Sequence, residues 1–176
     1  MMKKNIYCTA LLLAFGAIFS AQGADGNVTI TGEFFVPTCN LNAESKNMTV
    51  PLGNIQRSML KTTGSTSPEV LFTLKFSDCV ADTGVNVSFI GTTAGSDATV
   101  LLLDDPVNAS TAQNVGLQII NEWGGIIRPN VDWNGYMQAP SDGDFSLTYK
   151  VAYKALNDNV TPGDANATVE YNVIYQ

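Results

Sequence analysis

The chain has 176 residues, of which 9 are Lys or Arg and 16 are Asp or Glu, and its formal net charge is −7 at pH 7. A negative surface repels phosphate groups, so this balance argues against a nucleic-acid-binding protein. The sequence contains no histidine, which removes the Ser-His-Asp and Cys-His catalytic arrangements and the commonest zinc sites. We therefore expect no enzyme, no metal and no cofactor.

Residues 1–23 are predicted to form a secretory signal peptide. Lys3 and Lys4 precede an apolar stretch, and the small residues of Ala21-Gln22-Gly23 mark a cleavage site before Ala24. A membrane helix is the alternative, but the apolar stretch is shorter than the roughly 20 residues that a span needs. No other apolar run in the sequence is longer, so we expect no direct insertion into a membrane.

The cysteine pattern predicts one disulfide. Cys8 leaves with the signal peptide, and Cys39 and Cys79 remain. In an exported chain an even pair favours a disulfide over two free buried thiols. The loop of about 40 residues that it closes predicts a stabilisation of about 4 kcal/mol.

Strand patterns recur along the rest of the chain, whereas sustained helical patterns do not. A helical turn is expected only within 52–61. The strand predicted at 48–53 contains Pro51, which is typical of an edge strand. Short strands with frequent turns predict an all-β sandwich in one domain. The predicted strands cover residues 27–36, 48–53, 69–79, 85–91, 99–105, 115–121, 145–156 and 167–175.

Both ends of the mature chain alternate between apolar and polar residues. Chain ends usually fray unless they are tied down, so two well-formed terminal strands each need a strand to pair with. For the N-terminal strand, pairing within its own sheet is the simplest interpretation. One face of the N-terminal strand carries Gly26, Val28, Ile30, Gly32 and Phe34, and one face of the C-terminal strand carries Ala167, Val169, Tyr171, Val173 and Tyr175.

Four sequence features together point to a known family. The first is V-x-I-x-G-E-x-x-x-P-x-C, which ends at Cys39, and the second is the partner Cys79 in Ser-Asp-Cys. The third is the run N-V-G-L-Q-I at 114–119, and the fourth combines Gly163, fourteenth from the C-terminus, with the penultimate Tyr175. In these features the sequence resembles the pilin subunits of chaperone–usher fimbriae, of the type 1 and P-pilus kind.

The resemblance implies an incomplete immunoglobulin-like β-sandwich that lacks its final strand and is completed by a donor strand from a partner. It divides the chain into the signal peptide (1–23), an N-terminal donor-strand extension (24–34) and a pilin domain (35–176). It implies a structural fimbrial subunit that polymerises by donor-strand exchange and supports bacterial adhesion. The 15 residues before Cys39 are a short extension, which favours a minor or adaptor subunit over a major rod subunit.

The resemblance also assigns site residues and partners. The chain would pass through the periplasm to the cell-surface fimbrium. Its partners would be a periplasmic chaperone, an outer-membrane usher, and neighbouring pilin subunits or a tip adhesin. The donor strand would insert Val28, Ile30 and Phe34, with Gly32 at a close backbone approach. The groove and chaperone-binding strand would contain Gly163, Val169, Tyr171, Val173, Tyr175 and Gln176.

Two other function classes remain as alternatives. Trp123, Trp133 and Tyr136 would form the platform of a secreted sugar-binding module if they are exposed, although a core or interface position is favoured for the tryptophans. A hydrolase would use a carboxylate pair. The candidate pairs Asp104–Asp105 and Asp142–Asp144 lie at a strand end and around a turn glycine, which favours structural roles. A calcium site at 142–144 or 157–159 does not match the spacing of an EF-hand loop.

Overall fold

The computed structural model describes residues 29–32 and 38–176, and the chain divides into two units at residues 34 and 35. The predicted signal peptide and the donor residues Val28 and Phe34 lie outside the described residues. Residues 29–32 have no regular secondary structure. Within the described ranges, no helix combines the length and the apolar character that crossing a bilayer requires.

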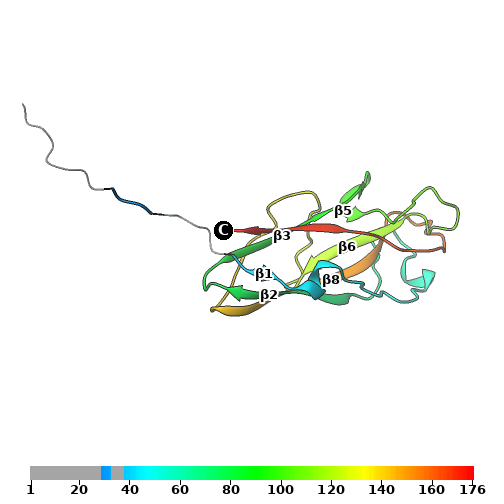
Figure 1. Cartoon of the computed structure of the whole chain (residues 1–176). Coiled ribbons are helices and arrows are strands. Elements are labelled where there is room, and N and C mark those ends of the chain that lie inside the picture. The colour runs from blue at the N-terminus through cyan, green and yellow to red at the C-terminus, as the bar shows by residue number, and fades with distance from the viewer. Residues whose placement is uncertain (1–28, 33–37) are drawn as a thin grey trace, which may run out of the picture. The chain divides into compact units, whose positions relative to one another are not determined.

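The second unit contains two antiparallel sheets (Figure 1). In the described part of this unit the helical elements are short, namely α1 (Ala43–Lys46) and the 3-10 helix η1 (Arg57–Met59). The larger sheet has the spatial order β1 (Asn40–Leu41), β2 (Val70–Cys79), β8 (Gly143–Ala155), β6 (Val115–Asn121), β5 (Asp97–Leu101) and β4 (Thr93–Ala94). The smaller sheet has the order β7 (Met137–Gln138), β3 (Gly84–Ile90) and β9 (Glu170–Tyr175).

The long strands follow the predicted pattern closely. β2, β6 and β9 lie within their predicted ranges, β3 and β8 differ by one or two residues at their ends, and β5 overlaps the start of its range. The helical turn expected within 52–61 is present as η1. The strand predicted at 48–53 is wrong, because Pro51 cannot donate to a ladder and Gly53 turns the backbone to a φ of +72°.

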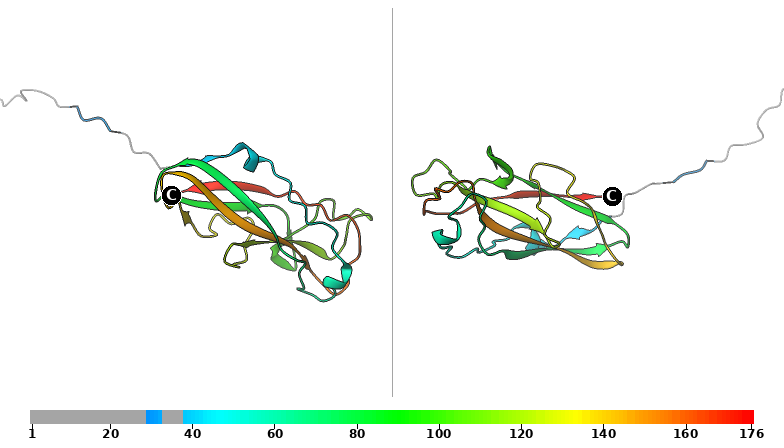
Figure 2. Two further views of the ribbon diagram at one scale, coloured as in Figure 1. Left: turned by 90° about the horizontal axis from the view of Figure 1, so that it is seen from below. Right: turned by 180° about the vertical axis from the view of Figure 1, so that it is seen from behind.

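The strand order matches an immunoglobulin-type sandwich with one strand missing. In that fold a sheet of strands A, B, E and D packs on a sheet of strands C, F and G. The order β1, β2, β8, β6 corresponds to A-B-E-D, while β3 and β9 correspond to C and F. In both views of Figure 2, β9 (red) lies beside β3 (green). Within the described ranges, no strand pairs with the other edge of β9. The predicted incomplete immunoglobulin-like sandwich is confirmed.

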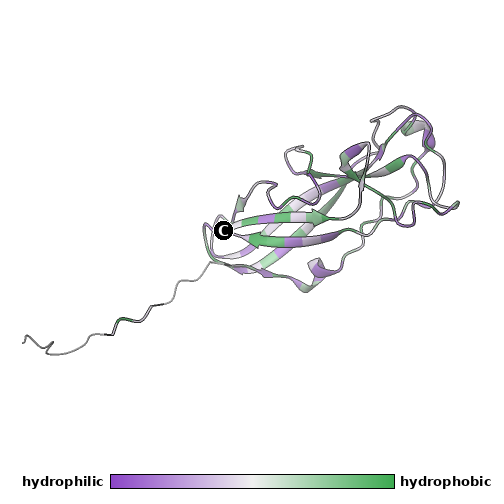
Figure 3. Cartoon of the chain, turned by 90° about the horizontal axis from the view of Figure 1, so that it is seen from above, coloured by the Kyte–Doolittle hydropathy of each residue, from purple (hydrophilic) through white to green (hydrophobic). Residues whose placement is uncertain are grey.

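The core lies between the two sheets and follows from the alternation of the strands. Figure 3 shows this alternation as green and purple bands along the ribbons. The core-facing side chains of β3, Val85, Val87 and Phe89, are at most 3% exposed. Phe89 also packs edge-to-face on Tyr149 of β8, with ring centroids 5.1 Å apart. These contacts hold the smaller sheet against the larger one.

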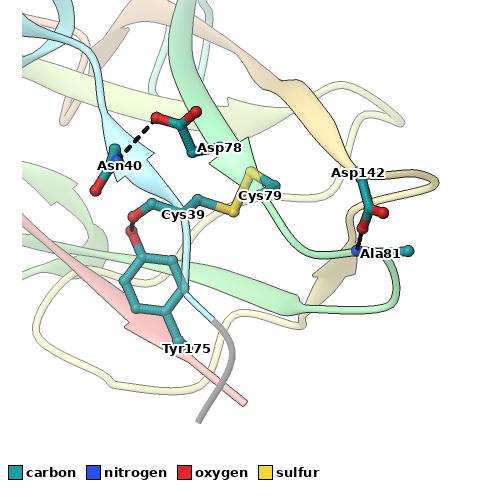
Figure 4. Close-up of a disulfide and its surroundings, with 7 residues drawn as sticks. All are labelled: Cys39, Asn40, Asp78, Cys79, Ala81, Asp142 and Tyr175. Atoms are coloured by element: carbon teal, nitrogen blue, oxygen red, sulfur yellow. Dashed lines mark hydrogen bonds between the residues drawn. A yellow bond between two sulfur atoms is a disulfide. The ribbon is translucent and has the colours of Figure 1, made fainter. Parts of the chain in front are cut away.

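The predicted disulfide between Cys39 and Cys79 is present (Figure 4). It joins the residue just before β1 to the last residue of β2. Next to it, the Asn40 amide donates to the carboxylate of Asp78 at 2.9 Å. The disulfide therefore fixes the start of the described second unit to the larger sheet.

Replacing both cysteines by serine is expected to lower the free energy of unfolding by about 4 kcal/mol, because the closed loop of 40 residues restricts the unfolded chain. Urea unfolding of the double variant measures this loss. Reduced wild-type protein is the matched control and should unfold at the same urea concentration as the variant. A change below about 1 kcal/mol would contradict the prediction.

Gly163 occupies a position where two backbones touch. A Cβ atom there would lie 2.4 Å from the amide nitrogen of Ala112 and 2.5 Å from the carbonyl oxygen of Ser110. The neighbouring Asp164 donates its amide to Ser110 at 2.7 Å and accepts from the amide of Ala112 at 2.9 Å. Gly163 precedes β9 rather than belonging to it, and its lack of a side chain permits this backbone pairing.

Gly163→Ala is expected to destabilise the sandwich by about 1–3 kcal/mol, since the inserted methyl group forces the two backbones apart. Gly95→Ala is the matched control, because a Cβ there meets no atom within 4 Å and its φ is not positive. Thermal or urea unfolding of both variants measures the difference. Equal stability of the two variants would show that the close approach is not limiting.

Candidate strand-acceptor edge

β9 uses only one of its two backbone edges within the described part of the chain. It pairs with β3 from Val85 opposite Tyr175 to Ile90 opposite Glu170. Its other edge faces residues 39–45, which reach it through side-chain hydrogen bonds from β9. No backbone hydrogen bond between β9 and residues 38–55 is found in the described structure. The amide and carbonyl groups of this edge are therefore open to pairing with another strand.

The core-facing side chains beside this edge are only half-buried. Thr168, Glu170 and Asn172 point outward and are exposed, so the predicted alternation of exposure holds up to Val173, while Ile174 is half-buried like its neighbours. On the neighbouring β3 the corresponding core-facing residues are fully buried, so between these two paired strands solvent reaches the core along β9 rather than along β3. The half-buried residues on the side of β9 are Ala165, Ala167, Val169, Tyr171, Val173 and Tyr175.

Residues 39–55 form the other side of the opening. Leu41, Val50, Leu52 and Ile55 are half-buried and pack against the same core. We call these four residues, together with the outer edge of β9 and its half-buried side chains, the open edge. Sequence reasoning missed this second side, although the apolar residues at 50, 52 and 55 were a weak signal of it.

Two tyrosines cross the open edge. Tyr171 donates its hydroxyl to the carbonyl oxygen of Ser45 at 2.5 Å, and Tyr175 donates to the carbonyl oxygen of Cys39 at 2.7 Å (Figure 4). Burial raises the pKa of both hydroxyls above the usual value near 10. Both groups therefore stay protonated at neutral pH and remain hydrogen-bond donors.

The C-terminal residue is tied down on the β3 side. Gln176 and Gly84 exchange two backbone hydrogen bonds of 2.9 Å each, which continue the ladder beyond the end of β9. The chain end is thus ordered by pairing on one side, while its other side belongs to the open edge. Of the predicted groove residues, Tyr171, Val173 and Tyr175 lie in β9, Val169 directly precedes it, Gln176 directly follows it, and Gly163 lies further before it.

Of the predicted donor residues, Ile30 and Gly32 lie within the described residues. Ile30 is 90% exposed, and a Cβ atom at Gly32 would meet nothing within 4 Å. Both belong to the first unit. An apolar side chain with this exposure is what a donor strand needs before it inserts into another molecule.

The two tryptophans are on the surface. Trp123 is 66% exposed and Trp133 is 67% exposed, so a core position is wrong for both, while an interface position stays a prediction. The ring of Trp133 packs edge-to-face on Tyr136, with centroids 4.8 Å apart. The preceding loop is fixed to β3 by the Asn86 amide, which donates to the carbonyl of Asp132, and by the Ser88 hydroxyl, which donates to the carbonyl of Val131. Their exposure is the property that the sugar-stacking hypothesis requires.

The candidate catalytic carboxylates stabilise loops. Asp104 accepts from the amide and the hydroxyl of Thr168, at 2.9 and 3.0 Å. Asp142 accepts from the amide of Ala81 at 2.7 Å. In the part of the chain that the structure describes, no three His, Cys, Asp or Glu side chains gather as a metal site would require.

Comparisons with known proteins agree with this geometry. The family model described as "Fimbrial protein" matches residues 28–176. The long polar fimbria protein A of Salmonella typhimurium is 31% identical, over 100% of this chain and 98% of its own. The probable major fimbrial subunit LpfA of Escherichia coli O157:H7 is 33% identical, over 99% of this chain and 98% of its own.

Solved structures show the same fold. A type I fimbria protein and antigen of Burkholderia pseudomallei superposes with a TM-score of 0.58 at 26% identity, covering 80% of this chain and 90% of that protein. The P pilus rod subunit PapA superposes with a TM-score of 0.64 at 19% identity, covering 78% of this chain and 99% of its own. The chain therefore belongs to the fimbrial protein family and is a structural subunit of a cell-surface fimbrium.

Proposed function

We propose that this subunit polymerises by donor-strand exchange, in which residues 24–34 of one copy enter the open edge of the next. The observation that carries the proposal is the unpaired outer edge of β9 above half-buried, core-facing side chains. A strand added there gains backbone hydrogen bonds from β9, and its alternate side chains cover the exposed core. Residues 35–176 are then the pilin domain that receives the strand.

The donor strand supplies enough apolar surface to hold a fibre together. Val28, Ile30 and Phe34 are its inserting residues, and burial of each contributes roughly 1.5–3 kcal/mol. Their sum, on the order of 5–9 kcal/mol, is comparable with the stability of a whole domain. Donor and open edge are different surfaces, so the contact is heterologous and propagates into a linear filament.

Before assembly, other proteins take the place of the neighbouring copy. Residues 1–23 direct the chain to the periplasm, where a chaperone lends a strand to the open edge and binds the C-terminal carboxylate with basic residues. An outer-membrane usher then exchanges this strand for the extension of the next subunit. No catalysis is part of this cycle.

A place in the shaft of the fibre is favoured over an adaptor position. The 33% identical relative is named a probable major fimbrial subunit, and the match covers nearly all of both chains. This likeness outweighs the length of the extension, which favoured a minor subunit. Copies in the shaft each carry one donor strand and one open edge, as a repeating polymer requires.

Ile30→Asp is expected to abolish polymerisation, because a carboxylate replaces a side chain that must enter an apolar site. A synthetic peptide of residues 24–34 with this change should bind the subunit at least tenfold more weakly, as follows from losing about 1.5–3 kcal/mol. Thr29→Asp, on the outward face of the same strand, is the matched control. Fibres are counted by electron microscopy and peptide affinity by fluorescence anisotropy. Equal effects of the two changes would refute the proposed strand register.

Val173→Thr is expected to weaken binding of the same peptide about tenfold, since it places a hydroxyl group at the half-buried centre of β9 without changing the shape of the side chain. Asn172→Thr is the control, because Asn172 is exposed on the opposite face and should keep its affinity within about twofold. Unfolding curves of both variants establish that they fold. Wild-type affinity in Val173→Thr would mean that the peptide binds elsewhere.

A further inference from the structure

The two phenol groups connect points that are fixed in different sheets. Cys39 is held to β2 by the disulfide. Ser45 is fully buried, and its hydroxyl oxygen accepts from the amide of Lys75 on β2 at 2.9 Å. Tyr171 and Tyr175 belong to β9, which is paired with β3. Each tyrosine therefore connects the smaller sheet to a carbonyl that is anchored to the larger sheet. The two tyrosines lie four residues apart along β9.

These connections fix residues 39–45 relative to β9. The hydrogen bonds of 2.5 and 2.7 Å start on side chains of β9 and end on carbonyls that are anchored to β2. They therefore restrain the segment that the outer edge of β9 faces.

The rings also lie below the level at which a strand would pair. Core-facing side chains project roughly perpendicular to a sheet, and Tyr171 packs near Phe89 of the core, with ring centroids 6.2 Å apart. Both tyrosines pack against the buried cluster. Their rings thus form part of the floor of the open edge and leave the backbone groups of β9 accessible.

We propose that Tyr171 and Tyr175 are positioning residues, whose hydroxyl groups hold residues 39–45 in a fixed place relative to β9 and so keep the open edge ready for an inserted strand. This inference rests on the donor-strand function proposed above. An edge whose two sides are already fixed loses less conformational freedom when the strand arrives, and binding is correspondingly favoured. Each tyrosine acts through the backbone that it holds, in addition to any contact of its ring with the donor.

The test removes the hydroxyl groups and keeps the rings. Tyr171→Phe, Tyr175→Phe and the double variant are prepared in the mature chain carrying Ile30→Asp, which suppresses self-donation. Association of a fluorescein-labelled peptide of residues 24–34 is followed by stopped-flow anisotropy. Each single change is expected to slow association between about twofold and tenfold, and the double change is expected to slow it further.

Tyr153→Phe is the matched control. Its hydroxyl donates to the carbonyl of Ala165 at 2.6 Å, so the variant loses the same kind of bond without releasing residues 39–45. All three single variants should lose similar stability in urea, and only the control should keep the wild-type association rate. An equal slowing in the control would mean that the tyrosine hydroxyls only stabilise the folded domain, and it would overturn the inference.

Two further outcomes separate the possibilities. Faster association in the Phe variants would show that the hydroxyl groups hold the edge shut, which contradicts the positioning role. Failure of the parent chain to bind the peptide at all would refute donor-strand exchange itself, together with the inference that rests on it. Unchanged rates in Tyr171→Phe and Tyr175→Phe, with peptide binding intact, would overturn the positioning role alone.

Discussion

The fold depends on one strand, β9, that is paired along only one of its two edges in the described structure. A backbone that lies beside an apolar core has to satisfy its amide and carbonyl groups, and β9 does so toward β3 alone within the described structure. From this one-sided pairing follow the half-buried side chains along β9 and the half-buried apolar residues Leu41, Val50, Leu52 and Ile55, which pack against the same core. Both sets favour completion of the fold by a strand from another molecule. Polymerisation is thus a completion of folding rather than an addition to it.

The sequence predicted those parts of the fold that repeat a local pattern. β2, β3, β6, β8 and β9 are long enough for alternation to be visible, and both their type and position were correct. β1, β4 and β7 have two residues each, too few for any periodicity. The second side of the open edge was missed because tertiary contacts create it. The bonds from Tyr171 and Tyr175 reach residues 126 and 136 positions away.

Family motifs pointed to individual residues without giving their physical roles. Gly163 was assigned to the groove strand, whereas its close contact with residues 110–112 explains why no side chain is tolerated. Asp104 and Asp142 were considered as catalytic groups, and both accept hydrogen bonds from backbone amides in loops. The exposure of Trp123 and Trp133 was beyond sequence reasoning, because a tryptophan between turn residues fits either a core or a surface.

The bond between Tyr175 and Cys39 has a mechanical consequence. In the polymer proposed above, a pull on residues 24–34 would reach the sandwich at Cys39, the residue just before β1. Cys39 is linked covalently to β2 and through the Tyr175 hydroxyl to the end of β9. In that polymer, tension would be shared between both sheets at this point, and the covalent link would prevent β1 from being peeled off β2 one hydrogen bond at a time.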